Sequence, residues 1–220
     1  GRTVLNLYTA TEGKVYFGQT EVTALGVNQL RLMRQKMQMI FQDPFSSLNP
    51  RMTLLDIVGE PLTNHNIGNR SEREDRVADA LKLVGLRPEF MRRFPHAFSG
   101  GQRQRIGIAR ALVLRPRLIV ADEPVSALDV SVQAQVLNLM LDLQEELDLT
   151  YLFVAHDLSV VQHICDRVLV MNRGRVVESG TVTDVFERPQ ENYTKLLLSA
   201  IPSTDPDVPL QPLDREQLGI

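Results

Sequence analysis

The segment Leu118-Ile119-Val120-Ala121-Asp122-Glu123-Pro124 decides the fold class of this chain. Its first four residues form a continuous apolar run, which is typical of a strand buried on both faces of a parallel sheet. Asp122 and Glu123 follow at the carboxyl end of that strand, where open α/β sheets bind ligands. Adjacent carboxylates there can divide the work, the first holding Mg²⁺ and the second orienting or deprotonating a water. A solvated acidic turn before Pro124 explains the same two residues equally simply.

Strand and helix patterns alternate on both sides of this segment. We expect strands over residues 37–41, 151–155 and 168–171 and helices over 100–114, 130–147 and 158–164. The strand over 37–41 should stop before Pro44, because proline has no N–H to donate to a ladder. The strand over 151–155 is apolar enough to be a second buried strand, and the strand over 168–171 continues the alternation. This order predicts an α/β fold with a parallel sheet.

The remaining patterns predict smaller elements around this core. Before the core we expect a helix over 4–8 closed by a turn at 11–13, and a hairpin of 14–17 and 21–23 around Gly18. Between 44 and 97 we expect a short helix at 54–58 and a second helix that starts at Ser71, where Glu74 completes a capping box, and ends at Gly85. After the core we expect a turn at 172–174, a strand at 175–178 and a short helix capped by Thr183. Four prolines interrupt every periodic pattern after Ile201, so we expect little order there.

Several polar residues at strand ends and helix starts are candidates for chemistry. His156 ends the strand over 151–155 and can donate a hydrogen bond to a phosphate, although Asp157 could equally satisfy it. Ser99-Gly100-Gly101 at a helix start can bring amide N–H groups to an anion, or can be an ordinary cap with a flexible glycine pair. Gln42 can contact a metal or water, or simply end a strand. An N-cap role fully explains Asp129.

Composition narrows the class of protein. The chain has 220 residues with 24 basic and 27 acidic side chains, a balance that argues against a general nucleic-acid surface. A single cysteine, Cys165, forms no internal disulfide and suits a reducing, cytosolic setting. The apolar runs are far shorter than the roughly 18 residues of a membrane-spanning helix, and the start shows no signal-peptide pattern. We therefore expect a protein that does not cross a membrane.

Five motifs in order resemble the ATP-binding cassette (ABC) ATPases. They are Phe41-Gln42-Asp43-Pro44, Phe98-Ser99-Gly100-Gly101-Gln102, Leu118 to Glu123, Ser126-Ala127-Leu128-Asp129 and His156-Asp157, which match that family's Q-loop, signature motif, Walker B strand, D-loop and switch histidine. The resemblance extends over residues 4–187. The stretch 41–51, Phe98 and residues 193–202 are similar to the oligopeptide, dipeptide and nickel importer branch.

The resemblance implies roles for the candidate residues. Two subunits would face each other head to tail with ATP between them, and Asp122 and Gln42 would contact Mg²⁺. Glu123 would act on the attacking water, while His156 would contact the γ-phosphate. The signature residues Ser99, Gly100, Gly101 and Gln102 would bind the nucleotide from the other subunit, and Asp129 would bridge the two sites.

The resemblance also implies a domain organisation and partners. The fold would be a P-loop NTPase-like parallel-sheet core with an α-helical subdomain and a small antiparallel part. Residues 1–43 would be part of the nucleotide-binding core, 44–97 the helical subdomain that meets the permease, 98–190 the catalytic core and 191–220 a partly disordered extension. The protein would lie at the cytoplasmic face of the membrane and bind permease subunits, which receive solute from an extracytoplasmic binding protein. No nucleic-acid partner is expected.

One family motif does not occur in residues 1–220: the phosphate-binding loop Gly-x-x-x-x-Gly-Lys-Ser/Thr. We therefore expect that the chain begins just downstream of its own phosphate loop. The main hypothesis is an N-terminally truncated ATPase subunit of an importer for peptides or related solutes, impaired in ATP binding by itself. The alternative is a non-hydrolytic module that docks on a permease or an intact ATPase partner. A cassette ATPase of DNA repair or translation is disfavoured by the near-neutral charge.

Overall fold

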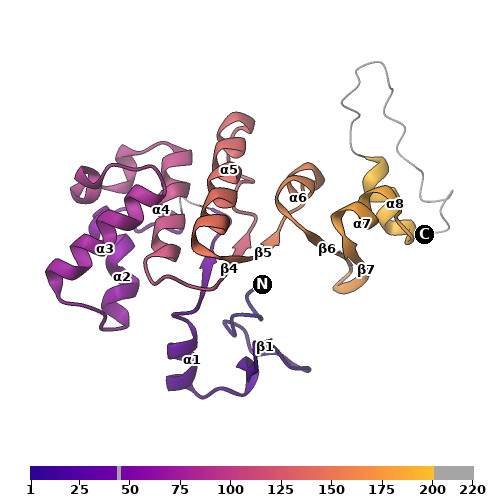
Figure 1. The fold of residues 1–220 in the computed structure, drawn as a ribbon, viewed down its shortest axis with the longest axis horizontal. Coiled ribbons are helices and arrows are strands. Elements are labelled where there is room, and N and C mark those ends of the chain that lie inside the picture. Colours follow the sequence, from indigo (N-terminus) through magenta and orange to yellow (C-terminus); the bar gives the residue numbers. More distant parts are fainter. Residues whose placement is uncertain (44–45, 201–220) are drawn as a thin grey trace. The chain divides into compact units, whose positions relative to one another are not determined.

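The computed structural model describes residues 1–43 and 46–200. The chain divides into two compact units, residues 1–154 and 155–220. Figure 1 shows their elements, and each unit is described by itself. Among the described residues, no helix is both long enough and apolar enough to span a membrane.

The first unit is built on a three-stranded parallel sheet with the order β3-β4-β5. Its strands are β3 (Met37–Ile40), β4 (Leu118–Asp122) and β5 (Thr150–Val154). β4 is central, and its middle residues 119–121 are fully buried, so the buried parallel strand predicted there is confirmed. The prediction that β5 is buried is wrong, because β5 pairs only with β4 among the described strands and its residues are exposed or half-buried.

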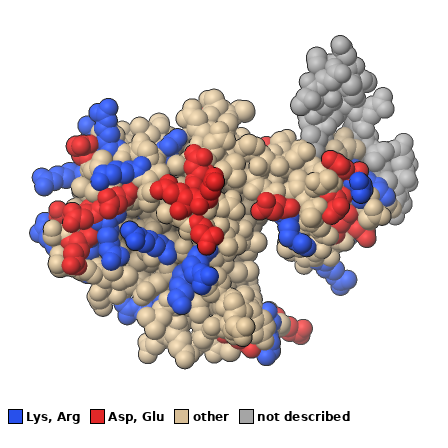
Figure 2. Space-filling model, in the orientation of Figure 1, with Lys and Arg blue, Asp and Glu red and all other residues tan. Residues whose placement is uncertain are grey.

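Besides α1 (Val27–Met33), the described part of the first unit has four longer helices. They are α2 (Leu54–Asn64), α3 (Arg70–Leu83), α4 (Gly100–Leu112) and α5 (Val130–Leu147), with short 3-10 turns at Pro88–Arg92 and Pro95–Ala97. Of these helices, α4 packs against β3. Helices α2, α3 and α4 pack on one another and form the helical layer at the left of Figure 1. Over this layer, basic and acidic side chains interleave rather than gather by sign (Figure 2).

The starts of α2 and α3 are set by capping boxes. Thr53 exchanges hydrogen bonds with Asp56, and α2 continues through Pro61 to Asn64, beyond the short helix predicted at 54–58. Asn69 exchanges them with Glu72 at the start of α3. The predicted N-cap Ser71 is therefore wrong by two residues, since the neighbouring Asn69 box forms in its place.

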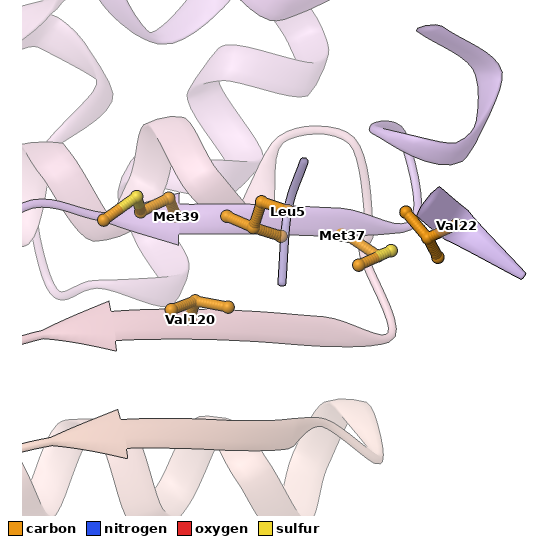
Figure 3. Packing of buried hydrophobic residues seen from close by; sticks show 5 residues of the cluster. All are labelled: Leu5, Val22, Met37, Met39 and Val120. Atoms are coloured by element: carbon orange, nitrogen blue, oxygen red, sulfur yellow. The ribbon is translucent and has the colours of Figure 1, made fainter. Parts of the chain in front are cut away.

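The first eight residues do not form the predicted helix. They make hydrogen-bonded turns, and the left-handed backbone of Asn6 (φ 50°) ends the only helical turn. Helix nucleation is costly in so short a stretch, so packing decides its shape. Leu5 is 4% exposed and lies against β3 with Val120 of β4 nearby (Figure 3). Burial of such a side chain contributes about 2 kcal/mol.

A small antiparallel hairpin follows around Gly18, as predicted, but the strand expected over 21–23 is wrong at 22–23, which lie in a 3-10 turn. The hairpin consists of β1 (Tyr16–Phe17) and β2 (Thr20–Glu21), and it leads into a 3-10 turn at Val22–Ala24 and helix α1 (Val27–Met33). Val22 of that turn is fully buried in the cluster that Leu5, Met37, Met39 and Val120 form (Figure 3). The N-terminal region is thus held to the sheet by apolar packing.

The second unit contains a β-hairpin between helices. Its described elements are α6 (Leu158–Ile164), β6 (Arg167–Asn172), β7 (Arg175–Thr181), α7 (Val182–Glu187) and α8 (Asn192–Ser199). The expectation that β6 continues the parallel alternation is wrong, because β6 pairs antiparallel with β7. Arg173 and Gly174 both have positive φ, which suits a two-residue hairpin turn. α7 is capped by Thr181, two residues before the predicted Thr183. The little order expected after Ile201 falls outside the described residues.

Candidate active site

Parallel pairing of β3 and β4 brings Gln42 and Glu123 together although 81 residues separate them. Ile40 pairs with Ala121, so Gln42 and Glu123 each lie two residues beyond the same rung of the sheet. The Gln42 Nε2 donates a hydrogen bond to the Glu123 Oε2 at 2.9 Å. The predicted cluster at the carboxyl edge therefore contains at least these two side chains in direct contact, with Asp122 beside them at the end of β4.

Glu123 has an unusual backbone conformation. Its φ of 48° lies in the left-handed region, which costs a non-glycine residue energy and which the surrounding structure must impose. Its N–H donates to the Val154 carbonyl at 2.9 Å, and its own carbonyl accepts from the Ser126 hydroxyl at 3.1 Å. These bonds hold the half-buried carboxylate at the end of β4. Backbone strain of this kind gathers at functional sites, and local sequence contains no signal for it.

Asp122 has a cationic neighbour that sequence reasoning missed. The Arg2 Nη2 lies 3.8 Å from the Asp122 Oδ2, with the two side chains 49% and 26% exposed. A pair at this distance and exposure contributes at most about 1 kcal/mol. Arg2 reaches Asp122 because Leu5 anchors the N-terminal turns on the sheet. Only the folded chain brings these two residues together.

The start of α4 is capped without charge. Ser99 accepts a hydrogen bond from the Gln102 N–H, and the Gln102 side chain accepts from the Ser99 N–H at 3.1 Å. This box leaves the N–H groups of Gly100 and Gly101, the first two helical residues, without acceptors inside the helix. A side chain at Gly101 would overlap Val132 Cγ1 of α5, so close helix packing explains that glycine. The positive end of the helix dipole favours an anion at this helix start.

The start of α5 is capped by a carboxylate. Asp129 accepts hydrogen bonds from the Val132 N–H at 3.0 Å and the Ser131 hydroxyl at 2.8 Å. These bonds, the Val132 bond first, hold the pKa of Asp129 below its usual value of 3.8. The cap role expected of Asp129 is confirmed, and its role as a bridge between two sites stays a prediction.

His156 belongs to the second unit. It is exposed and lies directly before Asp157, which caps α6 and accepts a hydrogen bond from the Ser159 N–H at 2.9 Å. The Asp157 carboxylate thus has a helix-capping role of its own. That His156 joins the carboxylates of β4 stays a prediction.

The donor set suits a magnesium ion bound mainly by phosphate and water. No group of three or more His, Cys, Asp or Glu side chains with metal-binding geometry occurs among residues 1–43 and 46–200. Mg²⁺ in nucleotide sites uses only one or two protein ligands, and its preferred ligand atom is oxygen. Asp122 supplies a carboxylate, and Gln42, whose Nε2 faces Glu123, has its Oε1 left for a cation. These two residues fit the ion.

The fold and this edge define an α/β protein of the P-loop NTPase-like class. Residues 2–126 match the family model described as ABC transporter, and the chain belongs to the ABC transporter family. The family resemblance inferred from the five motifs is therefore confirmed.

Relatives and solved structures agree with this assignment. A Brucella ovis protein named for peptide import and ATP binding is 56% identical over 207 residues, covering 94% of this chain and 65% of that protein. Oligopeptide transport ATP-binding protein OppF of Bacillus subtilis is 54% identical, covering 94% of this chain and 68% of OppF. The chain thus spans about 65% of the length of the former protein.

Two solved structures share the fold at moderate sequence identity. The cbiO1 protein of Clostridium perfringens, part of the ABC transporter complex cbiONQ, superposes with a TM-score of 0.76 at 27% identity, covering 85% of this chain and 73% of cbiO1. The ATP-binding cassette MJ0796, a dimer bound to ADP and Pi, gives 0.70 at 33% identity, covering 82% and 79% of the two chains. The predicted fold class is confirmed.

Proposed function

We propose that the protein is the ATP-hydrolysing subunit of an ABC importer for peptides or related small solutes. The observation that carries the proposal is the contact between Gln42 and Glu123 at the carboxyl edge of the parallel sheet, with Asp122 adjacent. The edge combines a carboxylate that can accept a proton from water with oxygen ligands for a cation, as phosphoryl transfer to water requires.

Each residue has a distinct task in this reaction. Glu123 orients the attacking water and takes its proton, and the bond from Gln42 holds the carboxylate in place. Asp122 and Gln42 hold Mg²⁺, which when bound neutralises charge on the phosphates. Gly100 and Gly101, with Ser99 and Gln102 shaping the helix start, bind phosphate of a nucleotide shared with a second subunit packed head to tail. His156 donates a hydrogen bond to the terminal phosphate, and Asp129 lies between the two sites.

The peptide class and the partners follow from the relatives. Proteins 53–56% identical to this chain are named for peptide or oligopeptide transport. We infer the same task here, performed at the cytoplasmic face of the cell membrane on permease subunits that receive solute from an extracytoplasmic binding protein. Residues 44–97 contribute the permease contact.

The test measures ATP hydrolysis by the 220-residue chain and by a fusion of this chain to part of a relative. Because residues 1–220 contain no phosphate-loop sequence, the fusion places ahead of Gly1 the part of Bacillus subtilis OppF that precedes its matched region. We expect the fusion to hydrolyse ATP and Glu123→Gln to lower kcat by about 10²- to 10⁴-fold, since a positioned general base contributes that much. In a Bacillus subtilis strain without OppF, the fusion should restore uptake of a labelled oligopeptide.

A matched control separates the effect of losing the Glu123 carboxylate from the effect of losing one negative charge. Glu145→Gln removes an exposed carboxylate on α5, outside the candidate site, and should leave kcat unchanged. Equal hydrolysis by the Glu123 and Glu145 variants would refute the catalytic assignment. A fusion that binds nucleotide and never hydrolyses it would favour the non-hydrolytic interaction module.

A further inference from the structure

Three arginines of α4 each donate a hydrogen bond to a backbone carbonyl in a different segment of the first unit. Arg103 donates to Pro95 at 3.0 Å, Arg105 to Val84 at 2.9 Å and Arg110 to Ser47 at 2.8 Å. The first two targets belong to the helical layer. The third target, Ser47, lies in the segment after β3, of which residues 41–43 and 46–47 are described and which includes Gln42. The bond of Arg110 therefore joins α4 to the segment that contributes Gln42 to the candidate site.

Arg110 contacts this segment at two points. Its guanidinium donates to the Ser47 carbonyl, and its Cζ lies 5.9 Å from the centre of the Phe41 ring, within cation–π range. Burial lowers the pKa of Arg110, and the Glu60 carboxylate of α2 opposes that shift. The guanidinium group is a cation throughout the physiological pH range. The contacts lie one residue before and five residues after Gln42.

The same segment continues to Glu123. Gln42 directly follows Phe41 and donates to the Glu123 Oε2 at 2.9 Å. The Ser47 N–H donates to the Asp43 carbonyl at 3.1 Å, which ties Ser47 back to the residue after Gln42. A continuous series of contacts therefore runs from Arg110 through Phe41 and Ser47 to the carboxylate at the end of β4.

We propose that Arg110 is a positioning residue that holds the segment after β3 so that Gln42 meets Glu123. Its consequence for catalysis rests on the proposed function. Arg110 lies on the same helix as the Ser99 cap, eleven residues and roughly 16 Å away along the axis.

The first test needs no nucleotide. In the 220-residue chain, amide hydrogen exchange is measured at single residues by NMR for Arg110→Met. This substitution keeps an unbranched apolar stem and removes the guanidinium donors. Arg110 bonds the Ser47 carbonyl, and the Ser47 N–H donates to the Asp43 carbonyl in the same segment. Without the charged hydrogen bond the segment should open more often, so we expect the Ser47 N–H to exchange about tenfold faster or more. Unchanged Ser47 exchange in a folded Arg110→Met variant would overturn the proposal.

The matched control lies on the same helix. Arg105→Met removes an equivalent bond from an arginine to a carbonyl, but its partner is Val84. It should accelerate exchange at the Gly85 amide, next to that carbonyl, and leave Ser47 unchanged. Arg110→Lys keeps the charge and replaces the Met variant if that variant does not fold. Its single ammonium cannot serve both contacts, so Ser47 exchange should still exceed the wild-type rate.

The second test uses the OppF fusion. We expect Arg110→Met to lower kcat with little change in KM, and Gln42→Ala to add little further loss in that background, because both act through one contact. Fully additive losses, or an unchanged kcat, would overturn the proposal. A fusion without hydrolysis would refute the proposed function alone, because the exchange result stands without it.

Discussion

The first turns of α4 and α5 lie against each other, but one is capped by a neutral side chain and the other by a negatively charged one. They touch so closely that a Cβ at Gly101 would overlap the Val132 side chain. α4 is capped by the neutral hydroxyl of Ser99, whereas α5 is capped by the ionised carboxylate of Asp129. The positive end of the α5 dipole is thus already offset by its own residue, while that of α4 is not.

This difference indicates which helix start can receive an external anion. A carboxylate cap stabilises its helix and repels phosphate at the same place, but a neutral cap leaves the field of the helix dipole to a ligand. The close packing at Gly101 explains why one of the two glycines is needed whether or not an anion binds. Three substitutions at these helix starts test whether the cap controls access of an anion.

The largest effect is expected from Ser99→Asp, which makes the start of α4 resemble that of α5. Asp is as good an N-cap as Ser, so the free energy of unfolding should change little. At about 5 Å and an effective dielectric near 20, the new carboxylate repels each unit of phosphate charge by roughly 3 kcal/mol. We expect kcat/KM of the OppF fusion to fall about a hundredfold, measured beside urea unfolding.

Ser99→Ala is the control for this change. It loses the cap and about 1 kcal/mol of stability but adds no charge, so its hydrolysis should fall much less. Hydrolysis by Ser99→Asp at the wild-type rate would show that Ser99 does not face phosphate.

An intermediate effect is expected from Gly101→Ala, which separates the two helix starts. Overpacking costs about 1–3 kcal/mol, and the better helix propensity of alanine returns up to about 1 kcal/mol. Urea unfolding should therefore show a net loss of about 1–2 kcal/mol. In the Gly101→Ala/Val132→Ala double variant the loss should be smaller than the sum of the two single losses. Simple additivity would mean that Val132 is not the obstacle.

The smallest effect is expected from Asp129→Asn, which keeps a cap and removes its titration. The folded-state pKa of Asp129 lies below its usual value, so its contribution to stability is present above that value and is lost as pH falls through the folded-state pKa. The melting temperature of the Asn variant should fall less steeply below about pH 4 than that of the wild type. Parallel pH profiles would contradict this account.

Elements with complete local signals were predicted closely. The bounds of α6 agree with the predicted 158–164, and Ser99 and Asp129 cap the helices assigned to them. The errors occur where local signals compete or are incomplete. Two capping boxes two residues apart precede α3, and only the folded chain shows that the one at Asn69 forms. The first eight residues are apolar enough for a helix but take their shape from packing on β3.

The positions of three candidate residues at strand ends were predicted, but the contact between Gln42 and Glu123 was not. The chemical roles of these residues stay predictions. Gln42, Asp122 and Glu123 could be named because each ends a strand with a strong apolar pattern. Arg2 and Arg110 could not be named in this way. Arg2 contacts Asp122, and Arg110 contacts Ser47 in the segment that includes Gln42, and each pair is too far apart in the sequence for a local pattern to indicate the contact. A basic residue near a helix end is too common to mark such a role.

Local sequence is enough to place residues at strand ends and helix starts, because strand periodicity, apolar stripes and capping side chains are properties of short segments. It does not show that Ile40 pairs with Ala121, that Glu123 takes a left-handed backbone or that Arg110 contacts both Phe41 and Ser47. These features arise on folding, because strand register depends on side chains many residues apart. A slip of one residue would turn Gln42 away from Glu123 without changing any local pattern.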